Sequence, residues 1–168
     1  TVRGLGDPDS SSLAERIIVG WSPVTNLIYT MEDRYDDVSL YQASEGIYEM
    51  LEWVIDADHS GGQYQLMQDL DLDPDRNNSA QAQNYHYFLK REHPIWFWGA
   101  ASWAGLPPYA DLRWTFQGEA GGPGTLNVET YFMGFDDIDF RSVDDSVIHI
   151  YEEGTIIGVG FAVIDDDD

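Results

Sequence analysis

Apolar and polar residues alternate along several stretches of the chain, which is the pattern of β-strands with one buried face. One alternating run covers residues 112–117 and another covers residues 126–132. Residues 118–124 lie between them and contain four glycines and a proline, which suits a loop rather than a strand. The two runs therefore predict a hairpin with a long connection.

The same alternation predicts a second hairpin near the C-terminus. Residues 147–151 and 155–163 are apolar runs, and Glu152, Glu153 and Gly154 between them suit a short turn whose glycine takes positive φ. Further strand candidates are residues 16–21, 26–31, 38–41, 63–70 and 85–90.

One amphipathic helix is predicted near residues 44–56. Ser44 is a suitable N-cap, and the apolar residues that follow have the i, i+3, i+4 spacing of one helix face: Ile47, Met50, Leu51, Val54 and Ile55. Residues 12–16 suit either a second short helix or the start of a strand.

Eight or nine short strands with loops of uneven length predict an all-β fold. We expect residues 1–168 to form one domain, a two-sheet antiparallel sandwich with the single helix inserted. A single jelly roll is favoured over an immunoglobulin-type sandwich, because the loops vary widely in length and no cysteine pair accompanies the tryptophans.

The charge of the chain changes this picture most. Asp and Glu number 31 against 8 Lys and Arg, which gives a formal net charge of −23. Nucleic acid is an improbable partner, since phosphate contacts need Lys and Arg. The acids are spread along the whole chain, and this composition resembles that of proteins from extremely halophilic archaea and their viruses. At molar salt the Debye length falls to about 3 Å, so most of the repulsion between such surfaces disappears.

Cysteine is absent, which excludes disulfides, thiolate metal sites and cysteine nucleophiles. No run of about 18 apolar residues occurs, so the sequence predicts no transmembrane segment, and the first residues lack the pattern of a signal peptide.

Two acidic segments are weak candidates for a cation site, because carboxylate oxygens are the ligands that Ca²⁺ prefers. One is the alternating set Asp69, Asp71, Asp73 and Asp75. The other holds Asp56 and Asp58 in a segment that resembles the first half of a calcium loop, but Met67 occupies the position of its bidentate ligand. Solvated acidic loops are the simpler interpretation. No cofactor is predicted beyond Ca²⁺ or loosely bound monovalent cations.

No pattern in the sequence predicts an enzyme. The four histidines His59, His86, His93 and His149 lack the spacing of a metal triad, and no serine lies in a nucleophile elbow. Phosphate-binding loops with lysine are also absent. We therefore predict no catalytic residues.

The most unusual segment is residues 94–109, which carries no charge at all. Its bulky aromatic residues are Trp96, Phe97, Trp98, Trp103 and Tyr109. They suit the core of the domain itself, a contact between subunits, where aromatic residues are enriched, or a platform on which sugars stack.

Taken together, the acidic, lysine-poor and cysteine-free composition, the strand pattern, the Trp-rich middle and the predicted hydrophobic C-terminal hairpin resemble a capsid protein of an icosahedral haloarchaeal virus. The type resembled is the small single jelly-roll major capsid protein of sphaerolipovirus-like viruses, which contain an internal membrane. That resemblance implies a virion protein without catalytic residues, assembled in the cytoplasm of a haloarchaeal host. It also implies capsomers made with itself and with a second capsid protein, and contacts to proteins of the underlying viral membrane. The alternative is a carbohydrate-binding sandwich of a halophile, using Trp96, Trp98, Trp103 or Tyr109.

Overall fold

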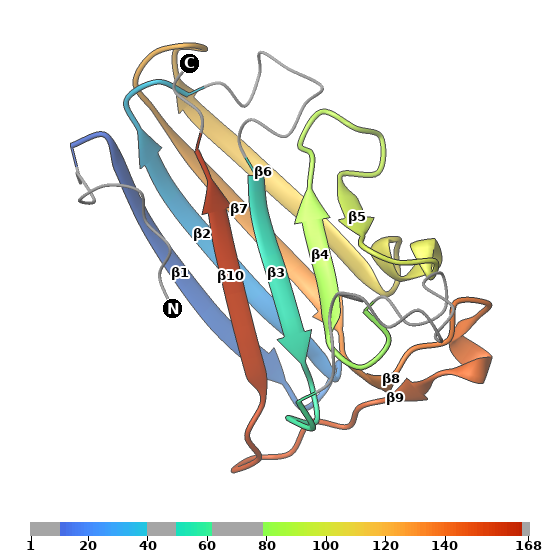
Figure 1. Cartoon of the computed structure of the whole chain (residues 1–168). Helices are drawn as coiled ribbons and strands as arrows, with labels where there is room; N and C mark the ends of the chain where they lie inside the picture. The colour runs from blue at the N-terminus through green and yellow to red at the C-terminus, as the bar shows by residue number, and fades with distance from the viewer. Residues whose placement is uncertain (1–10, 40–49, 62–78, 166–168) are drawn as a thin grey trace.

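The computed structural model describes residues 11–39, 50–61 and 79–165, and it has two four-stranded antiparallel sheets (Figure 1). The predicted all-β sandwich is thus confirmed. The strands are β1 (Leu13–Ser22), β2 (Leu27–Asp36), β3 (Met50–Asp56), β4 (Gln83–Tyr87), β5 (Ile95–Phe97), β6 (Ala110–Gly118), β7 (Gly124–Met133), β8 (Phe135–Asp137), β9 (Val147–Ile148) and β10 (Gly158–Ile164).

The first sheet has the order β1-β2-β7-β6 and consists of two hairpins placed side by side. The predicted hairpin of residues 112–132 is confirmed, because β6 pairs with β7 in register from Ala110 to Gly118. Gly118 has a φ of 149°, and a Cβ there would collide with the backbone of Pro123 and Gly124, so the loop requires glycine at this position. The strand candidates 16–21 and 26–31 lie within β1 and β2, which also pair as a hairpin.

The second sheet has the order β10-β3-β4-β5. The predicted hairpin of residues 147–163 is wrong: β9 pairs with β8, and β10 pairs with β3, about a hundred residues earlier in the chain. The short turn does form, since Thr155 donates to the carbonyl of Glu152 and Gly154 has a φ of 90°, but it joins two different sheets.

The predicted helix near residues 44–56 is also wrong, because residues 50–56 form strand β3. The buried side chains of β3 occur at every second residue, and they face the first sheet: Leu51, Trp53 and Ile55. Met50, Leu51, Val54 and Ile55 satisfy helical spacing as well, so the apolar pattern alone allowed both structures. Residues 44–49 lie outside the described residues.

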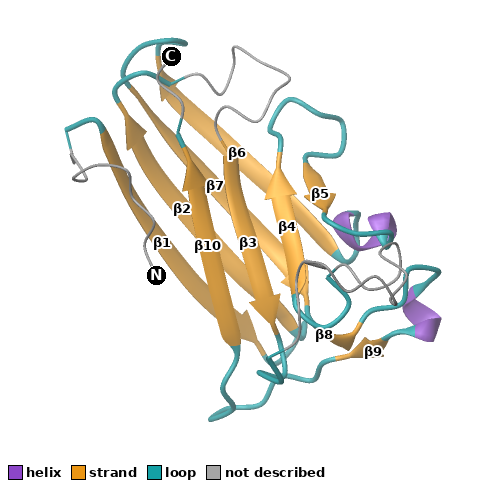
Figure 2. Ribbon diagram, in the orientation of Figure 1, coloured by secondary structure: helices purple, strands orange, loops and turns teal. Residues whose placement is uncertain are grey.

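Other expectations have mixed outcomes. Residues 12–16 lead directly into β1 rather than forming a helix. The candidate strand 85–90 overlaps β4, which ends at Tyr87. In the candidate strand 38–41, residues 38–39 lie outside the strands of the structure and residues 40–41 lie outside the described residues. The candidate strand 63–70 also lies outside the described residues. Within the described residues, helical structure is confined to two 3-10 turns, Ser102–Gly105 and Val143–Asp145 (Figure 2). Neither is long and apolar enough to cross a membrane.

The core lies between the two sheets. At its centre Phe132 of β7 packs against Trp53 of β3 and Tyr85 of β4, with ring centroids 6.2 and 4.6 Å apart. β5 and β6 contact each other at one side of the sandwich, and the edge strands toward the other side are β1 in the first sheet and β10 in the second (Figure 1). Several large exposed apolar side chains lie in these two edge strands.

Candidate functional site

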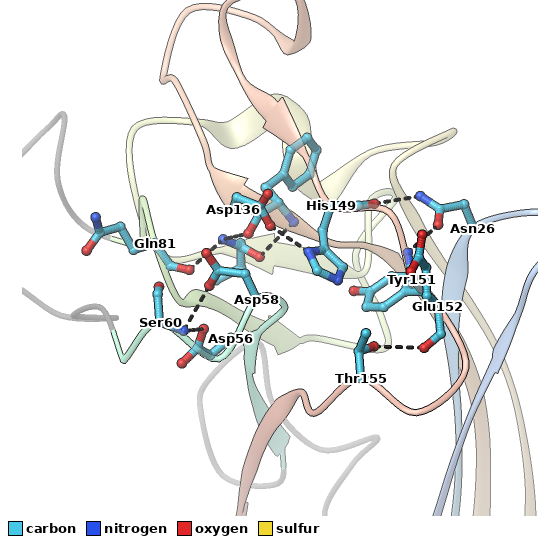
Figure 3. Close-up of polar contacts among 12 residues, drawn as sticks. Asn26, Asp56, Asp58, Ser60, Gln81, Asp136, His149, Tyr151, Glu152 and Thr155 are labelled. Carbon is cyan, nitrogen blue, oxygen red and sulfur yellow. Dashed lines mark hydrogen bonds and ion pairs between the residues drawn. The ribbon is translucent and has the colours of Figure 1, made fainter.

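The acidic turn after β3 folds onto its own backbone (Figure 3). The two carboxylate oxygens of Asp56 accept hydrogen bonds from the amides of Ser60 and Gly61, at 3.2 and 3.0 Å. Asp58 accepts from the Ser60 amide at 3.0 Å, and hydrogen bonding from Ser60 lowers the pKa of Asp58. These carboxylates therefore serve to close the turn, which is a usual role of Asp in loops.

Of the two cation candidates, the turn with Asp56 and Asp58 is the one the structure describes. Among the described residues, no three His, Asp or Glu side chains gather as a metal-binding group. The alternating set Asp69, Asp71, Asp73 and Asp75 lies outside the described residues. A calcium or monovalent cation site at these four aspartates stays a prediction.

A polar cluster at the same end of the sandwich was missed by the sequence analysis (Figure 3). The imidazole Nδ1 of His149 lies 2.6 Å from Asp136 Oδ1. Asn26, in the turn between β1 and β2, donates to the carbonyl of His149 at 2.7 Å and accepts from the amide of Tyr151 at 2.9 Å. Asn26 has a φ of 56°, which is a conformation that Asn tolerates and most residues avoid.

An aspartate–histidine pair can act in acid–base chemistry when the second imidazole nitrogen faces a substrate. In this protein Nε2 of His149 is buried and has no hydrogen-bond partner among the described residues, and the ring packs at 4.7 Å against Tyr151. The cluster instead ties segment 149–151 to the first sheet.

The Trp-rich segment divides between the core and the outer face of the second sheet. Phe97 is fully buried, and Trp103 packs edge-on against Phe135 and Tyr109, at 5.6 and 4.8 Å. Trp96 and Trp98 lie next to each other on the outer face, with centroids 5.7 Å apart. Trp96 is 42% exposed, which makes it the ring of this segment that a partner can reach most easily.

His86 of β4 lies between these two tryptophans, 5.2 Å from each ring. Both of its nitrogens are buried without a hydrogen-bond partner, and burial lowers the pKa of His86 despite the nearby carboxylate of Glu52. Asn84 donates to that carboxylate at 2.6 Å. His86 is thus held as a neutral aromatic ring that supports Trp96.

The inner face of β2 carries a buried ionic network that the alternation of the sequence did not predict. The Arg34 guanidinium lies 2.7 Å from Glu32 Oε1 and 3.0 Å from Glu15 Oε2, and the Tyr87 hydroxyl of the opposite sheet contacts both Glu32 oxygens. Burial raises the pKa of Glu32 and, together with the charge of Glu32, raises the pKa of Glu15 to about 7. The carboxylates of Glu15 and Glu32 share the single positive charge of Arg34. When Glu15 is protonated and neutral, the negative charge of Glu32 and the positive charge of Arg34 balance.

The later part of β1, with the turn that follows it, and β10 are apolar, partly exposed and free of charged residues. Residues 17–31 and 154–164 contain no Asp, Glu, Lys or Arg, although the whole chain has 31 acids. We call residues 17–24 and 156–164 the uncharged edge. Its large exposed side chains are Ile18, Val19, Trp21, Val24, Ile156, Val159 and Phe161. The sequence analysis had assigned these residues, apart from Val24, to strands but not to a surface.

Comparison of the chain with protein-family models, with curated proteins and with solved structures finds no match. What the uncharged edge and the Trp96 surface can do therefore follows from their own geometry and charge.

Proposed function

We propose that the chain is a structural subunit that assembles through protein–protein interfaces, as a capsid protein of an icosahedral haloarchaeal virus does. The observation that carries the proposal is the uncharged edge: in a chain of net charge −23, residues 17–24 and 156–164 contain no charged residue and expose seven large apolar side chains. Large exposed apolar patches on soluble proteins mark sites of association.

Electrostatics makes such an association dependent on salt. At low ionic strength the acidic surfaces of two copies repel each other before their apolar edges meet. In concentrated salt the repulsion is screened and the apolar contact is strengthened. Assembly in molar salt and dissociation in dilute salt are therefore the expected behaviour.

Trp96 supports a second contact on the opposite side of the subunit. It lies in β5, at the edge of the second sheet opposite β10, and its 42% exposure offers an aromatic anchor of the type enriched in interfaces. A subunit with two contact surfaces can join both copies of itself and a different capsid protein. This proposal includes capsomers made with a second capsid protein, contacts with proteins of a viral membrane, and a location in the virion.

The single jelly roll belongs to the same proposal. The second sheet supports it, because β3, β4 and β5 are consecutive and β10 returns beside β3, as in a Greek key. The first sheet gives it no support, since its two hairpins lie side by side.

Light scattering tests the proposal on the purified chain, dialysed from about 3 M to about 0.1 M NaCl, a range over which screening changes several-fold. Circular dichroism at each step shows whether the chain stays folded. We expect oligomers at high salt that dissociate before the fold is lost. A folded monomer at every salt concentration, alone or mixed with candidate capsid partners, would overturn self-assembly as the function.

A carbohydrate-binding module is the second candidate, and the exposed ring of Trp96 beside Trp98 favours it. Sugars that stack on Trp96 would quench its fluorescence, and Trp96→Ala would remove the quenching. Trp21→Ala, which changes an equally exposed tryptophan of the uncharged edge, is the matched control. Absence of quenching across a glycan panel excludes this candidate.

A further inference from the structure

Strand β10 is an edge strand that lacks the usual protection against pairing. Among the strands of the described residues it has a single neighbour, β3, and the backbone N–H and C=O groups of its other side face away from that sheet. Natural edge strands are commonly protected by charges, proline or bulges. Gly158–Ile164 has none of these, and its pairing with β3 is regular over all seven residues. A partner strand is the simplest reason for leaving this edge open.

The sequence of β10 is complementary to itself around Phe161. In an antiparallel pair centred there, Phe161 faces Phe161 of a second copy, and Val159 faces Val163 of that copy. On the other face, Gly160 meets Ala162. Large residues therefore meet large residues on the inner face. On the outer face the small Gly160 and Ala162 meet at the centre, and Gly158 lies opposite Ile164 at the two ends. No charges are opposed within the pair.

The acids that follow β10 also favour the antiparallel arrangement. Asp165 lies four residues from Phe161, so in this register the two Asp165 residues are separated by eight residues, or about 26 Å. That distance is about three Debye lengths at physiological ionic strength. A parallel pair would place the same acids side by side, where they repel.

We infer that β10 pairs antiparallel with β10 of a second copy, about a two-fold axis at Phe161, and so extends the second sheet across two subunits. The inference rests on the proposed function and names the partner that the uncharged edge binds. Phe161 is 56% exposed although its ring lies 6.0 Å from the core residue Trp53, and the pairing covers it.

A single introduced cysteine tests the register, because the chain has no other. Residues directly opposite each other in an antiparallel pair have Cα atoms about 4.5–5.5 Å apart, within the range of a disulfide. Phe161→Cys in about 3 M NaCl should form a disulfide-linked dimer under mild oxidation about tenfold faster than Val24→Cys does. Val24 is the matched control, since it is 91% exposed in the turn between β1 and β2. Equal rates for the two variants overturn the inference.

Phe161→Lys tests the energetics, since it opposes two like charges at the axis and should weaken dimerisation roughly tenfold or more. Ile156→Lys is its control, because Ile156 is 70% exposed but lies outside β10. If the wild type assembles while Phe161→Cys fails to cross-link, β10 pairing is overturned and the assembly proposal stands. If the wild type forms only dimers that Phe161→Cys locks, the pairing is supported and further assembly is overturned.

Discussion

The hydroxyl of Tyr87 on β4 lies 2.7 and 2.9 Å from the two carboxylate oxygens of Glu32 on β2, and this contact joins the two sheets through the core. Glu32 is 1% exposed, so it has no water to replace a lost donor. A buried carboxylate without its hydrogen bonds costs more than the bond itself contributes.

Tyr87→Phe is therefore expected to lower the free energy of unfolding by about 1–3 kcal/mol. Tyr85→Phe is the matched control, because the Tyr85 hydroxyl is buried on the same strand without a hydrogen-bond partner. Its removal should cost little or stabilise the fold. Denaturant unfolding of both variants in the same salt checks this, and equal losses for the two variants would contradict it.

The raised pKa of Glu15, about 7 in the folded chain, predicts an unusual dependence of stability on pH. Because the folded state binds this proton more tightly than the unfolded state, the contribution is fully present below about pH 4.5 and is lost as the pH rises through 7. A shift of this size corresponds to about 3 kcal/mol at most. The contribution of Glu15 should therefore make the free energy of unfolding higher at pH 5 than at pH 8.

Glu15→Gln separates that effect from other titrations. The variant keeps a neutral side chain at every pH, so its stability should change less between pH 5 and pH 8 than that of the wild type. Glu129→Gln removes an exposed carboxylate of β7 and controls for the change in net charge. If both variants keep the slope of the wild type, Glu15 is not its source.

The strands of the first sheet could be predicted because their alternation is local, and the pairing of β6 with β7 because these two strands are near in sequence; the pairing of β2 with β7, about a hundred residues apart, could not. Residues 112–117 and 126–132 are joined by the glycine-rich loop 118–124, which predicts a hairpin, and they pair as expected. The local alternation could predict neither the strand with which β10 pairs nor that residues 50–56 form a strand. β10 pairs with a strand about a hundred residues away, and the alternation of β3 coincides with helical spacing.

The buried network was missed for a different reason. Glu32, Arg34 and Asp36 occupy inward positions of β2, where alternation predicts apolar residues, so the strand was predicted to end near Met31. A charged residue is buried only where a partner compensates it. Tyr87 and Glu15 supply that compensation from another sheet and another strand, which no local pattern reveals.

We expect the tryptophan fluorescence to depend on pH through His86, which lies 5.2 Å from both Trp96 and Trp98. Burial lowers the pKa of His86, so its imidazolium forms only at pH values below 6.5, between Trp96 and Trp98. A charged imidazole beside an indole quenches its emission, and we expect a drop in fluorescence as the pH falls below 6.5. Because the folded pKa is lowered, protonation also costs stability in that range.

His86→Gln should remove this transition, and His59→Gln, which changes an exposed histidine of the turn after β3, should leave it unchanged. Fluorescence titrations at constant salt compare the three proteins. A transition that persists in His86→Gln would show that it comes from another group.

Gly134 lies where the first sheet passes into β8, and the space beside it is already filled. A Cβ at this position would overlap the hydroxyl of Tyr151 and lie 2.9 Å from the Cβ of Ala57. Tyr151 cannot move away freely, because its backbone amide is held by Asn26. Gly134→Ala should therefore cost about 1–3 kcal/mol through overpacking. Gly20→Ala is the control, since no atom lies within 4 Å of a Cβ at Gly20, and it should be neutral or slightly stabilising. Thermal unfolding of the two variants measures the difference, and an unchanged melting temperature for Gly134→Ala would mean that segment 149–151 is not fixed against the first sheet.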